Sequence, residues 1–311
     1  MSTEKSNICG NKIKSVALQI MANKITTKPF DLLFRENITH FPKTNHKLLG
    51  LPGTFKNKEE TKIFIKGCGN LEMDYLESVL PDEGMIKRES AINLEQETCP
   101  VKDEKAETIF NYCLNTIINL KKPCYTYVVT NNEYEKDYLT YCIEGFLLVI
   151  RLIIFGKERV YKILNRLKEK DYSKKEFSEE DYVLFVYCMV FAKKPYAQDI
   201  MEKLAKLFTS IDKIKIEYKQ DLYVSLCMMI KYHFEDCEKI QELIIMMTEN
   251  MQEEVIERLP TLEERKIELA KKDKELAEKD KEIAESKNTI SEKNKEIARL
   301  EKLLLSNNIV F

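Results

Sequence analysis

The chain has 311 residues, 44% of them hydrophobic, with only 8 glycines and 8 prolines, so it can bury a sizeable core in one large domain or two small ones. Its 50 basic and 52 acidic side chains leave a net charge of -2, which excludes a global positive field that would attract nucleic acid. Any contact with DNA therefore needs a local positive patch.

The cysteines and the most apolar segment indicate the compartment. The nine cysteines include no CxxC pair, which argues against a zinc site and predicts buried thiols in a reducing cytoplasm. The strongest apolar run, residues 145–155, is too short to span a bilayer and contains Arg151. The N-terminus has no pattern of charged and then apolar residues typical of a signal peptide. We therefore expect a soluble cytoplasmic protein that makes no membrane contact.

Short strand-like runs follow a helical start. Residues 1–28 are polar and mixed, and a short helix is expected from Pro29. Glycine and proline then mark residues 45–60 as a loop. Residues 71–84 end in a turn signal, Pro-Asp-Glu-Gly, and residues 89–98 read as the second arm of a hairpin.

The next segments predict the fold class. Apolar residues at helical spacing in residues 101–122 predict a helix, and CYTYVVT at 124–130 is typical of a buried strand. Two strands, a helix and a further strand indicate an α/β fold with a mixed sheet, in which the helix crosses over to a neighbouring strand.

The second half of the chain is helical in pattern. Helical periodicity over residues 157–258 predicts a lobe of helices, one of them capped by Ser178. From Leu262 to Leu304 a leucine or isoleucine recurs every seventh residue, with polar residues at the companion heptad position. Such a tail suits equally a weak coiled coil that forms a homodimer and a lone charged helix. The expected regions are a polar segment (1–28), an α/β domain (29–156), a helical lobe (157–258) and a heptad-bearing C-terminal helix (259–311).

Three carboxylates form the candidate site. Glu95 and Glu97 share one face of the second hairpin arm, because side chains alternate along a strand. The hairpin pairing brings Asp74 beside them. Like charges at close range repel unless a cation relieves the repulsion, and three carboxylates suit a hard divalent cation such as Mg²⁺.

The order of these residues resembles a known nuclease fold. An Asp on one strand, a Glu-x-Glu on the next, a helix and a further strand together resemble the PD-(D/E)xK nuclease fold, and within it the recombination-promoting, transposase-like nucleases. The resemblance covers roughly residues 29–256 and rests on three segments: PFDLLFREN at 29–37, INLEQET to CYTYVVT at 92–130, and GKERVYKIL to YCMVF at 156–191.

The resemblance implies a restriction-endonuclease-like core and metal-dependent hydrolysis of DNA phosphodiesters. It assigns Asp74, Glu95 and the carbonyl of Gln96 to Mg²⁺ or Mn²⁺. Glu97 falls in a slot usually occupied by Lys or Gln; it cannot supply a positive charge, but it can accept a proton from a metal-bound water. The alternative is a catalytically inactive nuclease fold that acts as a scaffold and self-associates through the C-terminal helix.

Several further residues are expected to have secondary roles. Glu36 on the first helix is a candidate accessory acid, as first-helix acids are in this fold. Lys102 and Lys105, at the start of the crossover helix, are candidate phosphate contacts. His40 and His46 lie in a glycine- and proline-rich stretch and are expected to be surface residues, not a ligand pair.

Overall fold

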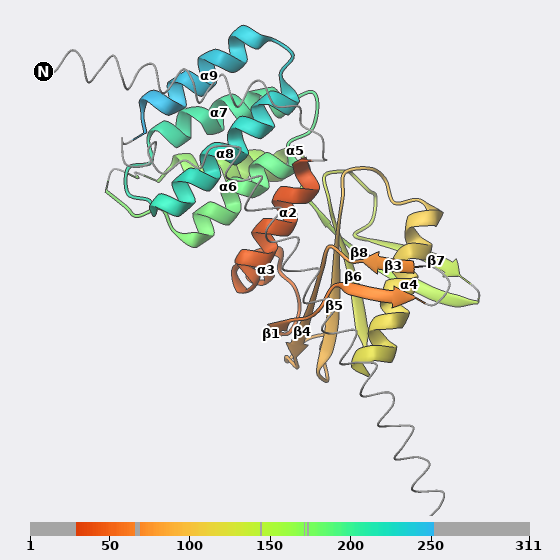
Figure 1. Ribbon diagram of the computed structural model, residues 1–311. Helices are drawn as coiled ribbons and strands as arrows, with labels where there is room; N and C mark the ends of the chain where they lie inside the picture. Colours follow the sequence, from red (N-terminus) through yellow and green to blue (C-terminus); the bar gives the residue numbers. More distant parts are fainter. Residues whose placement is uncertain (1–28, 66–68, 144, 171, 173, 252–311) are drawn as a thin grey trace, which may run out of the picture. The chain divides into compact units, whose positions relative to one another are not determined.

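The computed structural model describes residues 29–251 apart from 66–68, 144, 171 and 173, and for 62–72 it describes the backbone elements only. The described residues form a six-stranded mixed sheet, a two-stranded sheet and eight helices (Figure 1). The predicted α/β class with a mixed sheet is therefore confirmed. The predicted N-terminal segment and the C-terminal helix, with its homodimer, lie outside the described residues.

The main sheet combines antiparallel and parallel pairing. Its strand order is β1-β4-β5-β6-β8-β7. The strands β1, β4 and β5 pair antiparallel, β5, β6 and β8 run parallel, and β7 returns antiparallel along β8. In chain order they are β1 (Thr54–Lys58), β4 (Tyr75–Leu80), β5 (Ser90–Glu97), β6 (Cys124–Thr130), β7 (Tyr138–Ile143) and β8 (Phe146–Ile154). A separate hairpin pairs β2 (Lys62–Ile65) with β3 (Gly69–Glu72).

The helix α4 (Asp103–Leu120) makes the predicted crossover from β5 to β6 and covers one face of the sheet. Two acidic residues in its first turn stabilise the helix, because their negative charges interact with the positive end of the helix dipole. Its apolar stripe includes Ile109 and Phe110, which pack against Val128 of β6 and Ile150 of β8. Each such buried side chain contributes roughly 2 kcal/mol. This packing places the first turn of α4 next to the end of β5.

The hairpin of β4 and β5 forms as predicted, with Tyr75 opposite Leu94. Asp82 organises the connection between the two strands: its Oδ1 accepts a hydrogen bond of 2.9 Å from the Ile86 amide, and its Oδ2 one of 2.7 Å from the Gly53 amide. Gly53 has a φ of +80°, and a Cβ added there would lie 2.8 Å from the Leu80 carbonyl oxygen. Only glycine fits this close approach without strain.

The loop predicted for residues 45–60 is largely wrong. The helix α2 (Pro29–His40) is followed directly by α3 (Pro42–Leu49), and β1 begins soon afterwards. A proline in the first turn of α3 favours helix initiation, and Gly50 ends the helix in the left-handed conformation. The proline and the glycine therefore mark the two ends of a helix and do not indicate a loop.

The helical pattern predicted after residue 157 is observed as far as the described chain extends. The helices are α5 (Lys157–Lys168), α6 (Glu179–Phe191), α7 (Ala197–Thr209), α8 (Ile216–His233) and α9 (Cys237–Glu249). As predicted, Ser178 caps α6, and Asp181 completes a capping box. The helix α6 is buried almost throughout and contacts five other helices: α2, α3, α5, α7 and α8.

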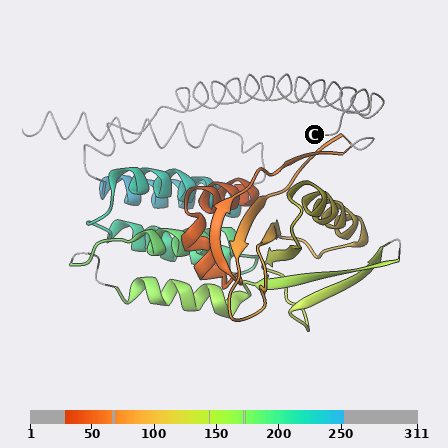
Figure 2. The same cartoon turned by 90° about the horizontal axis from the view of Figure 1, so that it is seen from below.

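The helices α2 and α3 connect the helical lobe to the sheet. The helix α2 contacts α6, α8 and β4, and α3 contacts α6 and β1. Figure 2 shows these two helices between the helices of the lobe and the strands, while the β7–β8 hairpin extends past α4. All the described residues belong to one compact unit.

Two further sequence predictions can be compared with the structure. None of the described helices is long and apolar enough to cross a membrane. The prediction of buried thiols holds for Cys188 and Cys227, but Cys99, Cys142 and Cys237 are exposed. Apolar sequence neighbours therefore did not indicate burial at these three cysteines, because each lies at or near the end of an element or on an edge strand.

Candidate functional site

The structure brings Asp74 and Glu95 together at one end of the sheet. Asp74 directly precedes β4, and the antiparallel register places it beside the end of β5. The Gln96 amide donates a hydrogen bond of 2.8 Å to Asp74 Oδ2, and the Asp74 amide lies 3.4 Å from Glu95 Oε1. A backbone amide of β5 therefore holds the Asp74 carboxylate, and the backbone amide just before β4 holds the Glu95 carboxylate.

Glu95 is buried, with 1% of its surface exposed. Burial, followed by the negative charge of Asp74, raises the pKa of Glu95 to about 7, although Lys105 opposes the shift. A carboxyl group normally ionises well below this pH. The raised pKa favours the protonated form of Glu95 compared with an ordinary carboxyl group, and an added cation would favour its ionised form.

A lysine from α4 lies between the two glutamates of β5. Lys105 Nζ is 3.0 Å from Glu95 Oε2 and 2.7 Å from Glu97 Oε1. Burial alone would lower the pKa of Lys105, but the two carboxylates outweigh burial and raise it. Lys105, predicted as a phosphate contact, therefore binds the carboxylates directly. Lys105 thus places a positive charge beside Glu97.

An arginine from α2 approaches Asp74 from the other side. Arg35 Nε lies 3.9 Å from Asp74 Oδ1, and its Nη2 donates to the Met73 carbonyl oxygen at 3.5 Å. Glu36, the predicted accessory acid, is exposed on the same helix, and Lys102 is exposed at the start of α4. The sequence pattern did not predict that Arg35 lies at this site, because only the tertiary packing of α2 near β4 brings it there.

Gln96 contributes its backbone to the site but not its side chain. Strand alternation directs the side chain to the face opposite α4, where it is 4% exposed. Its amide nitrogen and oxygen have no hydrogen-bond partner among the described residues. Tyr112 of α4 is a further side chain near the site: burial, with a smaller effect from the Glu95 charge, raises its pKa to about 12.

The donor atoms suit a hard cation, although they are few. Within the described part of the chain, no group of three or more His, Cys, Asp or Glu side chains is arranged to hold a metal ion. Asp74 and Glu95 offer carboxylate oxygens, the ligands that Mg²⁺ favours, and their mutual repulsion is already visible in the raised pKa of Glu95. Glu97 is paired with Lys105. The residues present therefore fit a divalent cation held by two carboxylates.

His46 is not the surface residue that the sequence predicted. Its Nδ1 lies 2.6 Å from Glu77 Oε1, and its Nε2 lies 3.1 Å from the Gly53 carbonyl oxygen. The side chains of His46 and Glu77 are both buried. Both ring nitrogens thus face oxygens that can accept hydrogen bonds, an arrangement that favours the protonated, positively charged ring. Burial lowers the pKa of His46, but Glu77 outweighs this effect and raises it above its ordinary value.

No protein-family model, curated protein or solved structure matches the chain.

Proposed function

We propose that the chain is a metal-dependent DNA endonuclease related to the recombination-promoting, transposase-like nucleases that its sequence resembles. The observation that carries the proposal is the meeting of Asp74, Glu95 and Lys105 at one end of a mixed sheet. Three separate elements supply two carboxylates and one amine, which is the set of charges that hydrolysis of a phosphodiester requires.

The order of the elements supports the same proposal. Asp74 directly precedes β4, Glu95 and Glu97 lie at the end of the neighbouring strand β5, and α4 then crosses over to β6. This is the order implied by the resemblance to a PD-(D/E)xK core. The position of Lys105 also answers the difficulty raised by Glu97, because the missing positive charge comes from the following helix.

Each side chain has a definable role in this proposal. Asp74 and Glu95 would hold Mg²⁺ or Mn²⁺, which when bound polarises a phosphoryl group and lowers the pKa of a water molecule. An ammonium group has three N–H donors, and Lys105 uses two of them on Glu95 and Glu97, which leaves one for a phosphate oxygen. Glu97 holds Lys105 in position.

A local positive patch supports DNA as the substrate. Arg35 lies beside Asp74, and burial, followed by the charge of Arg35, lowers the pKa of Lys58 at the end of β1. These two cations are therefore close enough to repel each other, and one of them adjoins the site, although the net charge of the chain is near zero. Such a patch can position a phosphate backbone without reading its sequence.

The alternative is an inactive scaffold with a nuclease fold. One observation favours it: Lys105 already pairs with both glutamates without a metal ion. The homodimer that such a scaffold would form through the C-terminal helix remains a prediction.

Plasmid nicking by the full chain in Mg²⁺ or Mn²⁺ tests the proposal. We expect Asp74→Ala and Lys105→Met each to reduce the nicking rate about a hundredfold or more, since each removes a charge needed at the phosphate. Glu104→Gln is the matched control, because Glu104 is exposed on the first turn of α4. Calorimetry of Mg²⁺ binding gives a second readout. A wild-type chain that neither nicks DNA nor binds Mg²⁺ more tightly than Asp74→Ala would favour the scaffold.

A further inference from the structure

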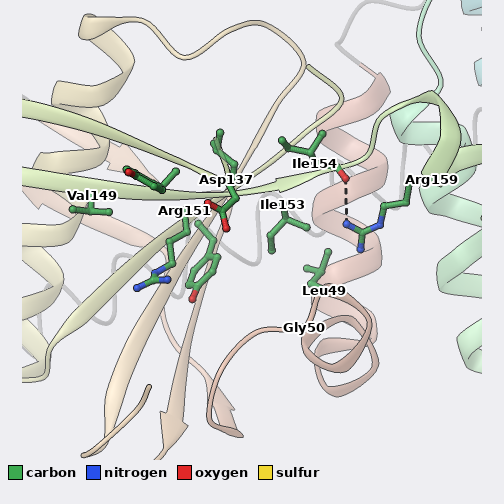
Figure 3. Close-up of a pocket in the computed structure, with 11 residues that line it drawn as sticks. Leu49, Gly50, Asp137, Val149, Arg151, Ile153, Ile154 and Arg159 are labelled. Atoms are coloured by element: carbon green, nitrogen blue, oxygen red, sulfur yellow. Dashed lines mark hydrogen bonds between the residues drawn. The ribbon is translucent and has the colours of Figure 1, made fainter. Parts of the chain in front are cut away.

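A cavity of about 490 Å³ opens on the sheet face opposite α4, where β6, β7 and β8 approach the end of α3 (Figure 3). Tyr127 and Arg151 line it, while their strand neighbours Val128 and Ile150 pack under α4. Glu95 lies on the α4 face, so this cavity is separate from the carboxylate site. Its volume is in the range of small-molecule binding pockets.

The first notable group in the cavity is Arg159, near the start of α5. Its Nη1 donates to the Ile154 carbonyl oxygen at 3.2 Å, and its guanidinium carbon lies 3.9 Å from the centre of the Phe155 ring. Among the described residues no carboxylate pairs with it, so most of its five N–H donors remain available. Burial lowers its pKa. A partly buried cation without a counter-charge is costly, and an anion in the cavity would remove that cost.

Arg151 supplies a second guanidinium. It stands in register with Tyr127 on β6 and Tyr138 on β7, and within the described chain it too has no carboxylate partner. Figure 3 shows Arg151 and Arg159 on either side of Ile153. Guanidinium groups match phosphate oxygens in a forked, two-bond geometry, so the cavity offers a cationic donor at each end.

The rest of the lining narrows the class of ligand. Asp137 offers a carboxylate that makes no hydrogen bond or ion pair within the described residues, and it therefore suits a hydroxyl or amino donor. Tyr127 and Tyr138 add aromatic rings on the same side of the sheet. A simple inorganic anion would use the arginines alone and would be repelled by Asp137. A ligand with a phosphate, hydrogen-bond donors and a planar ring would use the whole lining.

We propose that this cavity binds a nucleotide through its 5′-phosphate, either as a free nucleotide or as the phosphorylated end of a DNA strand. The phosphate meets Arg159, while Arg151, Asp137 and a tyrosine ring at the other end of the cavity meet the sugar and the base. Binding here does not depend on cleavage at the Asp74–Glu95 site, so the two proposals can fail separately.

Calorimetric titration of the full chain with deoxyadenosine 5′-monophosphate tests the inference. We expect saturable binding that weakens at least about tenfold in each of two variants: Arg159→Lys loses a forked pair of hydrogen bonds to the phosphate, and Arg151→Ala loses a contact to the sugar or base. Arg159→Lys keeps the charge and most of the aliphatic stem, which protects the fold. The matched control is Arg88→Ala, an exposed arginine distant in sequence from the cavity lining. Asp74→Ala should bind the nucleotide as the wild type does.

Two further titrations identify the source of the phosphate. A 5′-phosphorylated tetranucleotide that binds as well as the mononucleotide, while its unphosphorylated form does not, assigns the cavity to strand ends. Binding of the mononucleotide alone assigns it to free nucleotides. The inference is overturned if neither phosphorylated probe binds saturably at millimolar concentration, or if both arginine variants bind with wild-type affinity.

Discussion

Lys105 Nζ, in the first turn of α4, lies 2.7 Å from Oε1 of Glu97, the last residue of β5, so the two side chains form an ion pair. The pairing spans the short connection between β5 and α4. It also lets Lys105 reach Glu95, whose ionised form it stabilises.

Replacing Lys105 by methionine should therefore raise the pKa of Glu95 above about 7. The ionised form would lose its nearest cation, while burial and the Asp74 charge would still oppose ionisation. Carbon-13 NMR of the glutamate carboxyl groups across a pH titration measures this shift. Lys102→Met, an exposed change three residues earlier, should leave the titration in place. An unchanged Glu95 in Lys105→Met would contradict the electrostatic role given to Lys105.

Glu95→Gln should stabilise the metal-free protein near neutral pH. The folded pKa of Glu95, about 7, exceeds its ordinary value of 4.5, so its protonated form is the one that folding favours. That contribution is complete below pH 4.5 and is lost as the pH rises through 7, a change on the order of 3 kcal/mol. Urea unfolding between pH 5 and 8 should show this loss in the wild type and a flatter profile in Glu95→Gln. Lower stability of the variant at pH 8 would rule the idea out.

The buried His46–Glu77 pair predicts a second dependence on pH. Because the folded pKa of His46 is raised, its stabilising effect is complete below pH 6.5, the ordinary value, and declines as the pH rises through the folded value. His46→Ala leaves Glu77 buried and unpaired, which should cost about 3 kcal/mol in the free energy of unfolding. His40→Gln, at an exposed position, is the control. Equal unfolding midpoints for the two variants would show that the pair contributes nothing.

Gly53→Ala should destabilise the fold by about 2 kcal/mol, because it combines a left-handed φ with a close contact. The added Cβ would lie 2.8 Å from the backbone oxygen of Leu80, which cannot move without disturbing β4. Gly84→Ala is the matched control, since its added Cβ meets only the Asp82 side chain at 3.5 Å. Thermal unfolding compares the two; a melting temperature for Gly53→Ala as high as for Gly84→Ala would contradict the argument.

Local rules predicted the part of the site that lies on one hairpin. Period-two alternation put Glu95 and Glu97 on one face, and the turn after β4 put Asp74 beside them. The remaining partners could not be predicted in this way. Lys105 reaches the glutamates because α4 packs at a particular angle on the sheet, and Arg35 reaches Asp74 because α2 lies against β4. Such contacts depend on tertiary packing and not on spacing.

The misjudged loop has a similar cause. Glycine and proline correctly marked the ends of α3, but nothing local indicated that its histidine would be buried against a glutamate on β4. A polar side chain is predicted to be exposed unless a partner of opposite charge is known. Glu77, the partner of His46, lies 31 residues further along the chain.

The parallel register of β5, β6 and β8 has a consequence for how two ligands would communicate. Glu97, Thr130 and Ile154 stand side by side in that register, so the carboxylate site and the cavity both lie toward the same ends of adjacent strands. They nevertheless face opposite sides, as Val128 and Tyr127 on β6 do. A single layer of strands thus separates the two sides, and a ligand on one side can influence the other by shifting the backbone of these strands or through its charge.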